Sequence, residues 1–153
     1  MKSSVLRRLI NLWPPLFFNS ISATRMSHDY REIDVRLNLR WYNRNPVKSQ
    51  FGGNLFTMTD PWYMLMLMKN LGGSYYVWDK KASIDFISPG RTHVTAKFIL
   101  TEEKLAEIRA ATVNGEKYLP EFITEIFDSE NKLVARVHRT VYVKQKPAKP
   151  NRA

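Results

Sequence analysis

The feature that most constrains the fold is one long apolar stretch framed by two glycine pairs. It begins at Gly52–Gly53, ends at Leu71 and is followed by Gly72–Gly73. Its length and its leucine and methionine content favour a helix over a strand, and glycine after the last apolar residue is a common helix stop. Pro61 lies inside the stretch, so the helix must kink there or a new segment must begin. The run after Pro61 is too short for a membrane span of about 20 residues, so we expect a buried helix.

The segments around this helix alternate between apolar and polar residues, as strands with one buried face do. The clearest case is residues 30–41, where the residues of one face are Ile33, Val35, Leu37, Leu39 and Trp41. Similar patterns predict strands at residues 75–88, 92–100, 121–128 and 132–144. In the strand at 75–88, Ile84 and Phe86 share a face. A short helix is expected from Thr101, which suits an N-cap, to near Gly115.

The predicted order is helix, strand, long helix, two strands, short helix and two strands. A mostly antiparallel sheet with one long apolar helix indicates an α+β domain. We therefore predict a sheet of five to six strands that wraps around the long central helix.

The two ends of the chain differ from its middle. We expect residues 1–25 to be an N-terminal helical extension, residues 26–144 to be the folded domain, and the basic residues 145–153 to be disordered. Residues 4–13 suit a short amphipathic helix that docks on the domain. A cleaved leader is the alternative, because Arg7 and Arg8 precede an apolar run.

Composition limits the functional classes. The chain has 153 residues and no cysteine, which excludes disulfides, thiolate zinc sites and a cysteine nucleophile. The lack of cysteine fits a cytoplasmic protein. The formal net charge of +10 favours anionic partners, but the basic residues are spread along the chain, as on a solvated surface. We expect no nucleic-acid partner, because no recognition helix or aromatic-basic alternation accompanies the charge.

Most sequence motifs for enzyme chemistry are absent. The chain has no GxSxG elbow, phosphate-binding loop, GxGxxG or HExxH motif. The three histidines, His28, His93 and His138, are scattered without paired spacing. We therefore expect neither a metal site nor a cofactor.

The segment from Gly52 to Asp60 resembles a motif of the hotdog-fold acyl-CoA thioesterases of the phenylacetate-pathway type. That family has an Asn in the preceding loop, then His-Gly-Gly, then six residues and an Asp on the central helix. Here Asn45 lies in the loop, Gly52–Gly53 form the pair and Asp60 follows at the family spacing. FISPGR at 86–91 resembles the turn after the helix, and QFGGNLFTMTDPWYMLML looks most like an uncharacterised branch.

The resemblance implies a thioester hydrolase that works as a homo-oligomer. Backbone N–H groups near Gly53 would stabilise the oxyanion, and Asp60 would act as general base or nucleophile. In such dimers the helix end of one subunit and the aspartate of the other can share a site. The predicted catalytic residues are Asp60, Gly53, Asn45 and Gln50; the predicted substrate-binding residues are Gly52, Asn54, Arg44, Lys48, Arg91 and Met64. The three cations would meet the phosphates of CoA, and Met64 would line an acyl tunnel.

Two departures from the family pattern leave alternatives open. The family histidine is absent and Gln50–Phe51 stand there, so no proton carrier precedes the glycine pair. Asp60 is followed by Pro61, a pair typical of a helix N-cap and the first helical residue. Asp60 could therefore cap a helix instead of acting on a substrate. The competing function is a non-catalytic protein that binds an acyl group or acyl-CoA.

Overall fold

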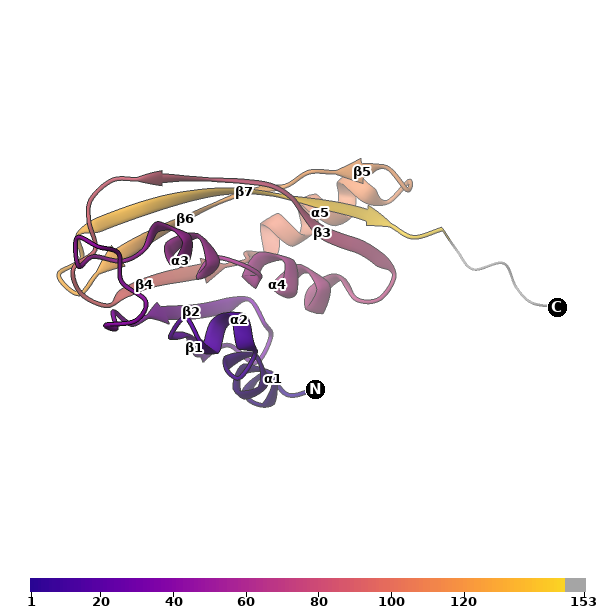
Figure 1. Cartoon of the computed structure of the whole chain (residues 1–153). Helices are drawn as coiled ribbons and strands as arrows, with labels where there is room; N and C mark the ends of the chain where they lie inside the picture. Colours follow the sequence, from indigo (N-terminus) through magenta and orange to yellow (C-terminus); the bar gives the residue numbers. More distant parts are fainter. Residues whose placement is uncertain (148–153) are drawn as a thin grey trace.

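The computed structural model describes residues 1–147 as one sheet folded around a central pair of helices (Figure 1). The strands are β1 (Ile21–Met26), β2 (Glu32–Leu37), β3 (Tyr75–Phe86), β4 (Val94–Ile99), β5 (Lys117–Tyr118), β6 (Glu121–Asp128) and β7 (Leu133–Gln145). The helices are α1 (Ser3–Asn11), α2 (Pro14–Phe17), α3 (Gly52–Thr57), α4 (Trp62–Leu71) and α5 (Glu102–Thr112). The seven-stranded sheet has the order β1-β2-β4-β6-β7-β3, β5 pairs with β7, and every pairing is antiparallel.

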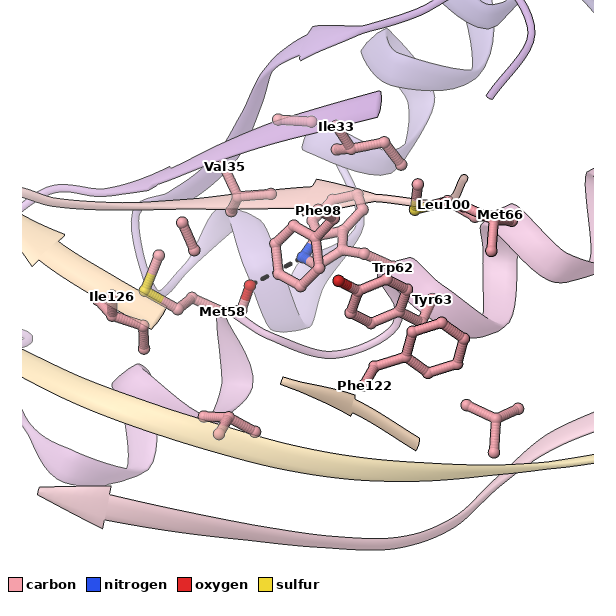
Figure 2. Close-up of a cluster of buried hydrophobic side chains, with 14 of the residues drawn as sticks. Ile33, Val35, Met58, Trp62, Tyr63, Met66, Phe98, Leu100, Phe122 and Ile126 are labelled. Carbon is pink, nitrogen blue, oxygen red and sulfur yellow. Dashed lines mark hydrogen bonds between the residues drawn. The ribbon is translucent and has the colours of Figure 1, made fainter. Parts of the chain in front are cut away.

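The predicted long helix is in fact two helices. Helix α3 ends at Thr57, and helix α4 begins at Trp62, the residue after Pro61. Figure 1 shows α3 and α4 between β3 and β7 on one side and β1 and β2 on the other. Within α4, Tyr63 packs between the rings of Phe98 and Phe122, with ring centroids 5.4 and 4.1 Å away (Figure 2). A sheet wrapped around a central apolar helix, the predicted architecture, is confirmed.

The alternating pattern at residues 30–41 is confirmed only as far as Leu37, where β2 ends. Trp41 was expected on the buried face, but its side chain is 81% exposed. The cause is a turn fixed by the buried Asn43, whose side-chain amide donates to the carbonyls of Asn19 and Asn38. These bonds lead the chain away from the sheet before Trp41.

The N-terminal extension is helical only to Phe17, because residues 21–26 form β1, an edge strand of the sheet. Helix α1 docks beside this strand, as predicted. The side chain of Asn11 pairs with Ala23 like a neighbouring strand would: its Oδ1 accepts from the backbone N–H at 2.8 Å and its Nδ2 donates to the carbonyl at 3.1 Å. The helix therefore covers backbone groups that would otherwise be open at the edge.

Two further predictions concern the C-terminal tail and the length of the helices. Gln145, the first residue of the tail predicted to be disordered, still belongs to β7, and residues 148–153 of that tail lie outside the described residues. None of the helices within residues 1–147 is long and apolar enough to cross a membrane.

Strand β3 has an irregularity that matters for the site. Asp79 pairs with Val141 and Lys81 with Thr140, so Lys80 is an extra residue in β3, a β-bulge. The bulge shifts the alternation, so that both Asp79 and Ala82 are half-buried. Ile84 is half-buried as well, whereas Phe86, expected on the same face, is 61% exposed at the end of the strand.

Candidate functional site

A pocket lies at each end of helix α3. A pocket of about 370 Å³ at its first turn is lined by Gly52 and Leu55, by the loop residues Asn45, Ser49 and Gln50, and by Phe86, Ile87, Ser88, Pro89 and Gly90. We call this the glycine pocket. A second pocket, of about 480 Å³, is lined by Phe56, Thr57, Asp60, Asp79, Lys80, Lys81, Ala82 and Arg139, and by Trp13, Pro15 and Leu16. We call this the aspartate pocket. The two lining sets share no residue.

Gln50 lies at the wall of the glycine pocket. Its side chain is only 3% exposed, and its Nε2 donates to the carbonyl of Thr92 at 2.9 Å. Its Oε1 is buried and accepts no hydrogen bond from the described residues. The bond to Thr92 therefore holds this amide inside the protein, with its oxygen enclosed by the chain.

Asn45 shapes the loop that carries Gln50. Its Oδ1 accepts from the N–H of Ser49 and its Nδ2 donates to the Ser49 hydroxyl, both at 2.9 Å. The backbone N–H of Asn45 also donates to the Ser49 carbonyl. Because the amide already has these partners, Asn45 fixes the position of the loop at the pocket wall.

Of the glycine pair, Gly52 lines the pocket and Gly53 does not. Asn54 and Leu55 donate their N–H groups to the carbonyl of Phe51, whereas the N–H groups of Gly52 and Gly53 have no acceptor in the part of the chain that the structure describes. A Cβ atom on Gly52 would lie 2.9 Å from the Phe86 ring. Glycine therefore lets an aromatic side chain lie directly against the helix backbone at this pocket.

The remaining predicted substrate-binding residues divide into two groups. Arg44, Lys48 and Arg91 are exposed on the loops beside the glycine pocket, and Arg91 Nη1 donates to the carbonyl of Val47 at 3.3 Å. Asn54 and Met64 line neither pocket. The Asn54 amide is buried and donates to the Asn43 carbonyl, so its visible role is to hold the preceding turn.

The aspartate pocket contains a buried arginine between two carboxylates. Arg139 is only 5% exposed; its Nη1 lies 2.6 Å from Asp79 Oδ2 and 3.6 Å from Asp60 Oδ2. Its Nη2 donates to the Thr59 hydroxyl at 3.4 Å, and the Phe56 ring lies 5.9 Å from the guanidinium. A cation this deeply buried needs such partners, because burial without them is very unfavourable.

Asp60 does not cap a helix. The residue at the N-cap of α4 is Pro61, and no side chain caps that end. The Asp60 carboxylate is instead 54% exposed and directed at Arg139. The helix-cap interpretation of Asp60 is therefore wrong, because the helix begins one residue later than an Asp-Pro cap requires.

Asp79 is the second carboxylate of this pocket. Burial raises the pKa of Asp79 above its ordinary value, and the charge of Asp60 adds to the rise, while Arg139 opposes both. Its Oδ1 is buried and has no partner among the described residues. The pocket thus contains one exposed carboxylate and one half-buried carboxylate on either side of one guanidinium.

The sequence patterns did not single out Arg139 and Asp79, although one signal was available. By strict alternation from Val137 to Val141, Arg139 occupies an inward position of β7, where a charge is unexpected. A charged residue at an inward strand position indicates a buried partner. The partner itself was hidden, because the bulge at Lys80 breaks the alternation that would have placed Asp79 inward.

The fold defines the class of protein. A sheet wrapped around a central helix is the hotdog fold, and solved thioesterase-like structures share it. PA5026 from Pseudomonas aeruginosa, a protein of unknown function, has a TM-score of 0.82 at 16% identity over 95% of this chain and 97% of that chain. Thioesterase HI1161 from Haemophilus influenzae has a TM-score of 0.69 at 15% identity, over 95% of this chain and 92% of that chain.

A point mutant of thioesterase PA1618 from Pseudomonas aeruginosa has a TM-score of 0.68 at 10% identity, with 92% and 93% of the two chains covered. The hotdog fold expected from the resemblance is confirmed. Within this class, the chain belongs to the family described as a domain of unknown function, DUF4442, whose model matches residues 2–143. No curated protein matches the sequence.

Proposed function

We propose that this protein hydrolyses acyl-CoA thioesters in sites that two copies of the chain build together. The observation that carries the proposal is the pair of pockets on α3. One contributes backbone donors of the glycine pair and lies beside Gln50, and the other contributes the exposed carboxylate of Asp60. Hydrolysis needs both sets of groups around one carbonyl, and a single chain separates them into two pockets.

The edges of the sheet support a dimer. At one edge, α1 covers β1 through Asn11. At the other, β3 is twelve residues long, and no strand within residues 1–147 pairs with its free side. A long open edge can pair with a strand of another chain, and β3 of a second copy would provide such a strand.

Such pairing would bring the two kinds of pocket together. Asp79 lies at the aspartate pocket and Phe86 at the glycine pocket, with Ala82 and Ser83 midway between them on β3. Antiparallel pairing about a two-fold axis at this midpoint sets Asp79 of one copy opposite Phe86 of the partner subunit. Each site would then combine one glycine pocket with the partner's aspartate pocket.

In this proposal, the thioester carbonyl oxygen accepts hydrogen bonds from the N–H groups of Gly52 and Gly53. As general base, Asp60 takes a proton from a water whose oxygen attacks the carbonyl carbon. The tetrahedral oxyanion collapses, the carbon–sulfur bond breaks, and the CoA thiolate leaves and is protonated. As nucleophile, Asp60 would instead form a mixed anhydride that water hydrolyses. Arg44, Lys48 and Arg91 would bind the CoA phosphates.

A non-catalytic acyl-CoA-binding protein is the second candidate. Gln50 favours it, because this amide lines the glycine pocket where a hydrolase of the related type has a proton carrier. A panel of acyl-CoA thioesters with a free-thiol readout separates the two. Release of CoA above the uncatalysed rate supports the hydrolase. Saturable binding of the same thioesters without any CoA release would contradict it and support the binding protein.

A further inference from the structure

Helix α1 has a second apolar face that points away from the domain. Leu6 and Ile10 are half-buried against the rest of the chain. Val5, Leu9 and Leu12 occupy the opposite side and are 45%, 54% and 66% exposed. Their spacing of four and three residues aligns them in one stripe. Because α1 already docks through its other side, this stripe is not needed to attach the helix.

Three exposed aromatic side chains follow the stripe along the chain, in α2 and at its two ends. Trp13, Phe17 and Phe18 are 47%, 53% and 70% exposed. Together with the stripe they form what we call the N-terminal patch: Val5, Leu9, Leu12, Trp13, Phe17 and Phe18. Figure 1 shows α1 and α2 on the outside of the molecule, beside β1. A cluster of large exposed apolar side chains marks a surface that contacts a partner.

The charge around the patch indicates which partner. Residues 1–28 contain no Asp or Glu. At about 100° per helical residue, Lys2 and Arg8 fall on the two borders of the stripe. Both are exposed, and neither forms an ion pair with any residue in the range 1–147. An apolar stripe with tryptophan and phenylalanine, bordered by cations, suits the interface of an anionic bilayer.

We propose that the N-terminal patch docks this protein onto anionic lipid surfaces, with α1 parallel to the membrane plane. The apolar side chains would enter the boundary between headgroups and acyl chains, and Lys2 and Arg8 would bind lipid phosphates. A second copy of the chain fits the patch less well, because Lys2 and Arg8 of the two copies would face one another there.

Docking would also place one candidate pocket at the membrane. Trp13 belongs to the patch and, with Pro15 and Leu16, lines the aspartate pocket. A thioester with a long acyl chain partitions into bilayers, so the site would meet it where it is concentrated. This consequence rests on the proposed hydrolase, whereas the docking itself does not.

The test is sedimentation of the full chain with vesicles, without any substrate. Phosphatidylcholine vesicles are compared with vesicles that contain about one third phosphatidylglycerol. We expect the protein to pellet with the anionic vesicles, and less so as salt rises. The double variant Leu9→Ser/Leu12→Ser should bind at least about tenfold more weakly, because it removes exposed apolar surface. Val113→Ser is the matched control, since Val113 is 65% exposed at the end of α5, and its binding should be unchanged.

Three results would overturn the docking proposal. The first is no pelleting of the protein with anionic vesicles, and the second is an equal loss of binding in Val113→Ser. The third is a protein that binds no vesicles and whose oligomer mass changes in the Leu9→Ser/Leu12→Ser variant, which would assign the patch to a second copy. Hydrolysis of a soluble short-chain acyl-CoA, measured without vesicles, tests the proposed function separately. A protein active there that fails to pellet loses only the docking proposal.

Discussion

Asp60 is the residue on which the proposed chemistry depends most directly. Asp60→Asn keeps the shape of the side chain and removes its basicity, so turnover should fall by about 100-fold or more. The melting temperature should barely move, because Asp60 is half exposed and Arg139 keeps its closer contact with Asp79. Glu130→Gln is the control, since Glu130 is exposed, lies in the turn between β6 and β7 and lines neither pocket. An active, stable Asp60→Asn protein would remove Asp60 from the mechanism.

Arg139 and Asp79 should behave as a unit. Arg139→Met alone leaves the half-buried Asp79 without its cation, and Asp79→Leu alone leaves the cation with only the distant Asp60. We expect each single change to lower the free energy of unfolding by about 3 kcal/mol and the double variant to lose much less than the sum. Urea unfolding of the four proteins measures this. Additive losses would show that the pair is not coupled.

At the residue scale, the sequence allowed prediction of site residues that are related by local spacing. It did not allow prediction of contacts between residues on different strands. The spacing of Gly52 and Asp60 could be read directly, and both residues line pockets. The contact of Arg139 with Asp79 joins two residues of different strands. Their pairing depends on strand register, which one sequence does not specify.

At the scale of elements, the attachment of α1 depends on Asn11. Its amide replaces a strand partner for Ala23, so Asn11→Ala should lower the free energy of unfolding by about 1–2 kcal/mol. Asn19→Ala is the matched control, because the Asn19 amide makes one exposed bond to Pro15 within its own turn. Chemical denaturation compares the two. Equal effects would mean that the bonds to Ala23 do not hold the helix.

The elements themselves show why some were predictable. The central apolar stretch and the strands at 92–100 and 121–128 follow from hydrophobic periodicity, which is a local property. Strand β1 was missed because it is short and carries the polar residues Ser22, Thr24 and Arg25, with few apolar residues to mark it. It forms through pairing with β2 and cover from α1, both tertiary effects.

At the scale of the whole molecule, the shared site can be tested by mixing. Asp60→Asn and Gly52→Val should each be inactive as homodimers, because the first lacks the base and the second forces a side chain against Phe86 in the glycine pocket. After the two are unfolded and refolded together, half of the dimers should be mixed, with one of their two sites intact. About a quarter of wild-type activity should return. Light scattering checks that the mixture is dimeric. No recovery from two folded variants that form mixed dimers would contradict a site built from two subunits.

The bulge at Lys80 also constrains how many residues strand β3 can contain. Upstream of it, Asp79 faces the interior beside Val77; downstream, Ala82 and Ile84 do. If Lys80 were deleted, the side chains in one half of the strand would have to point to the opposite face of the sheet. Either the acid or the apolar residues would leave the interior. In relatives of this chain, a one-residue deletion here that turns the acid outward should therefore coincide with replacement of the arginine at the position of Arg139, which would have lost its buried partner.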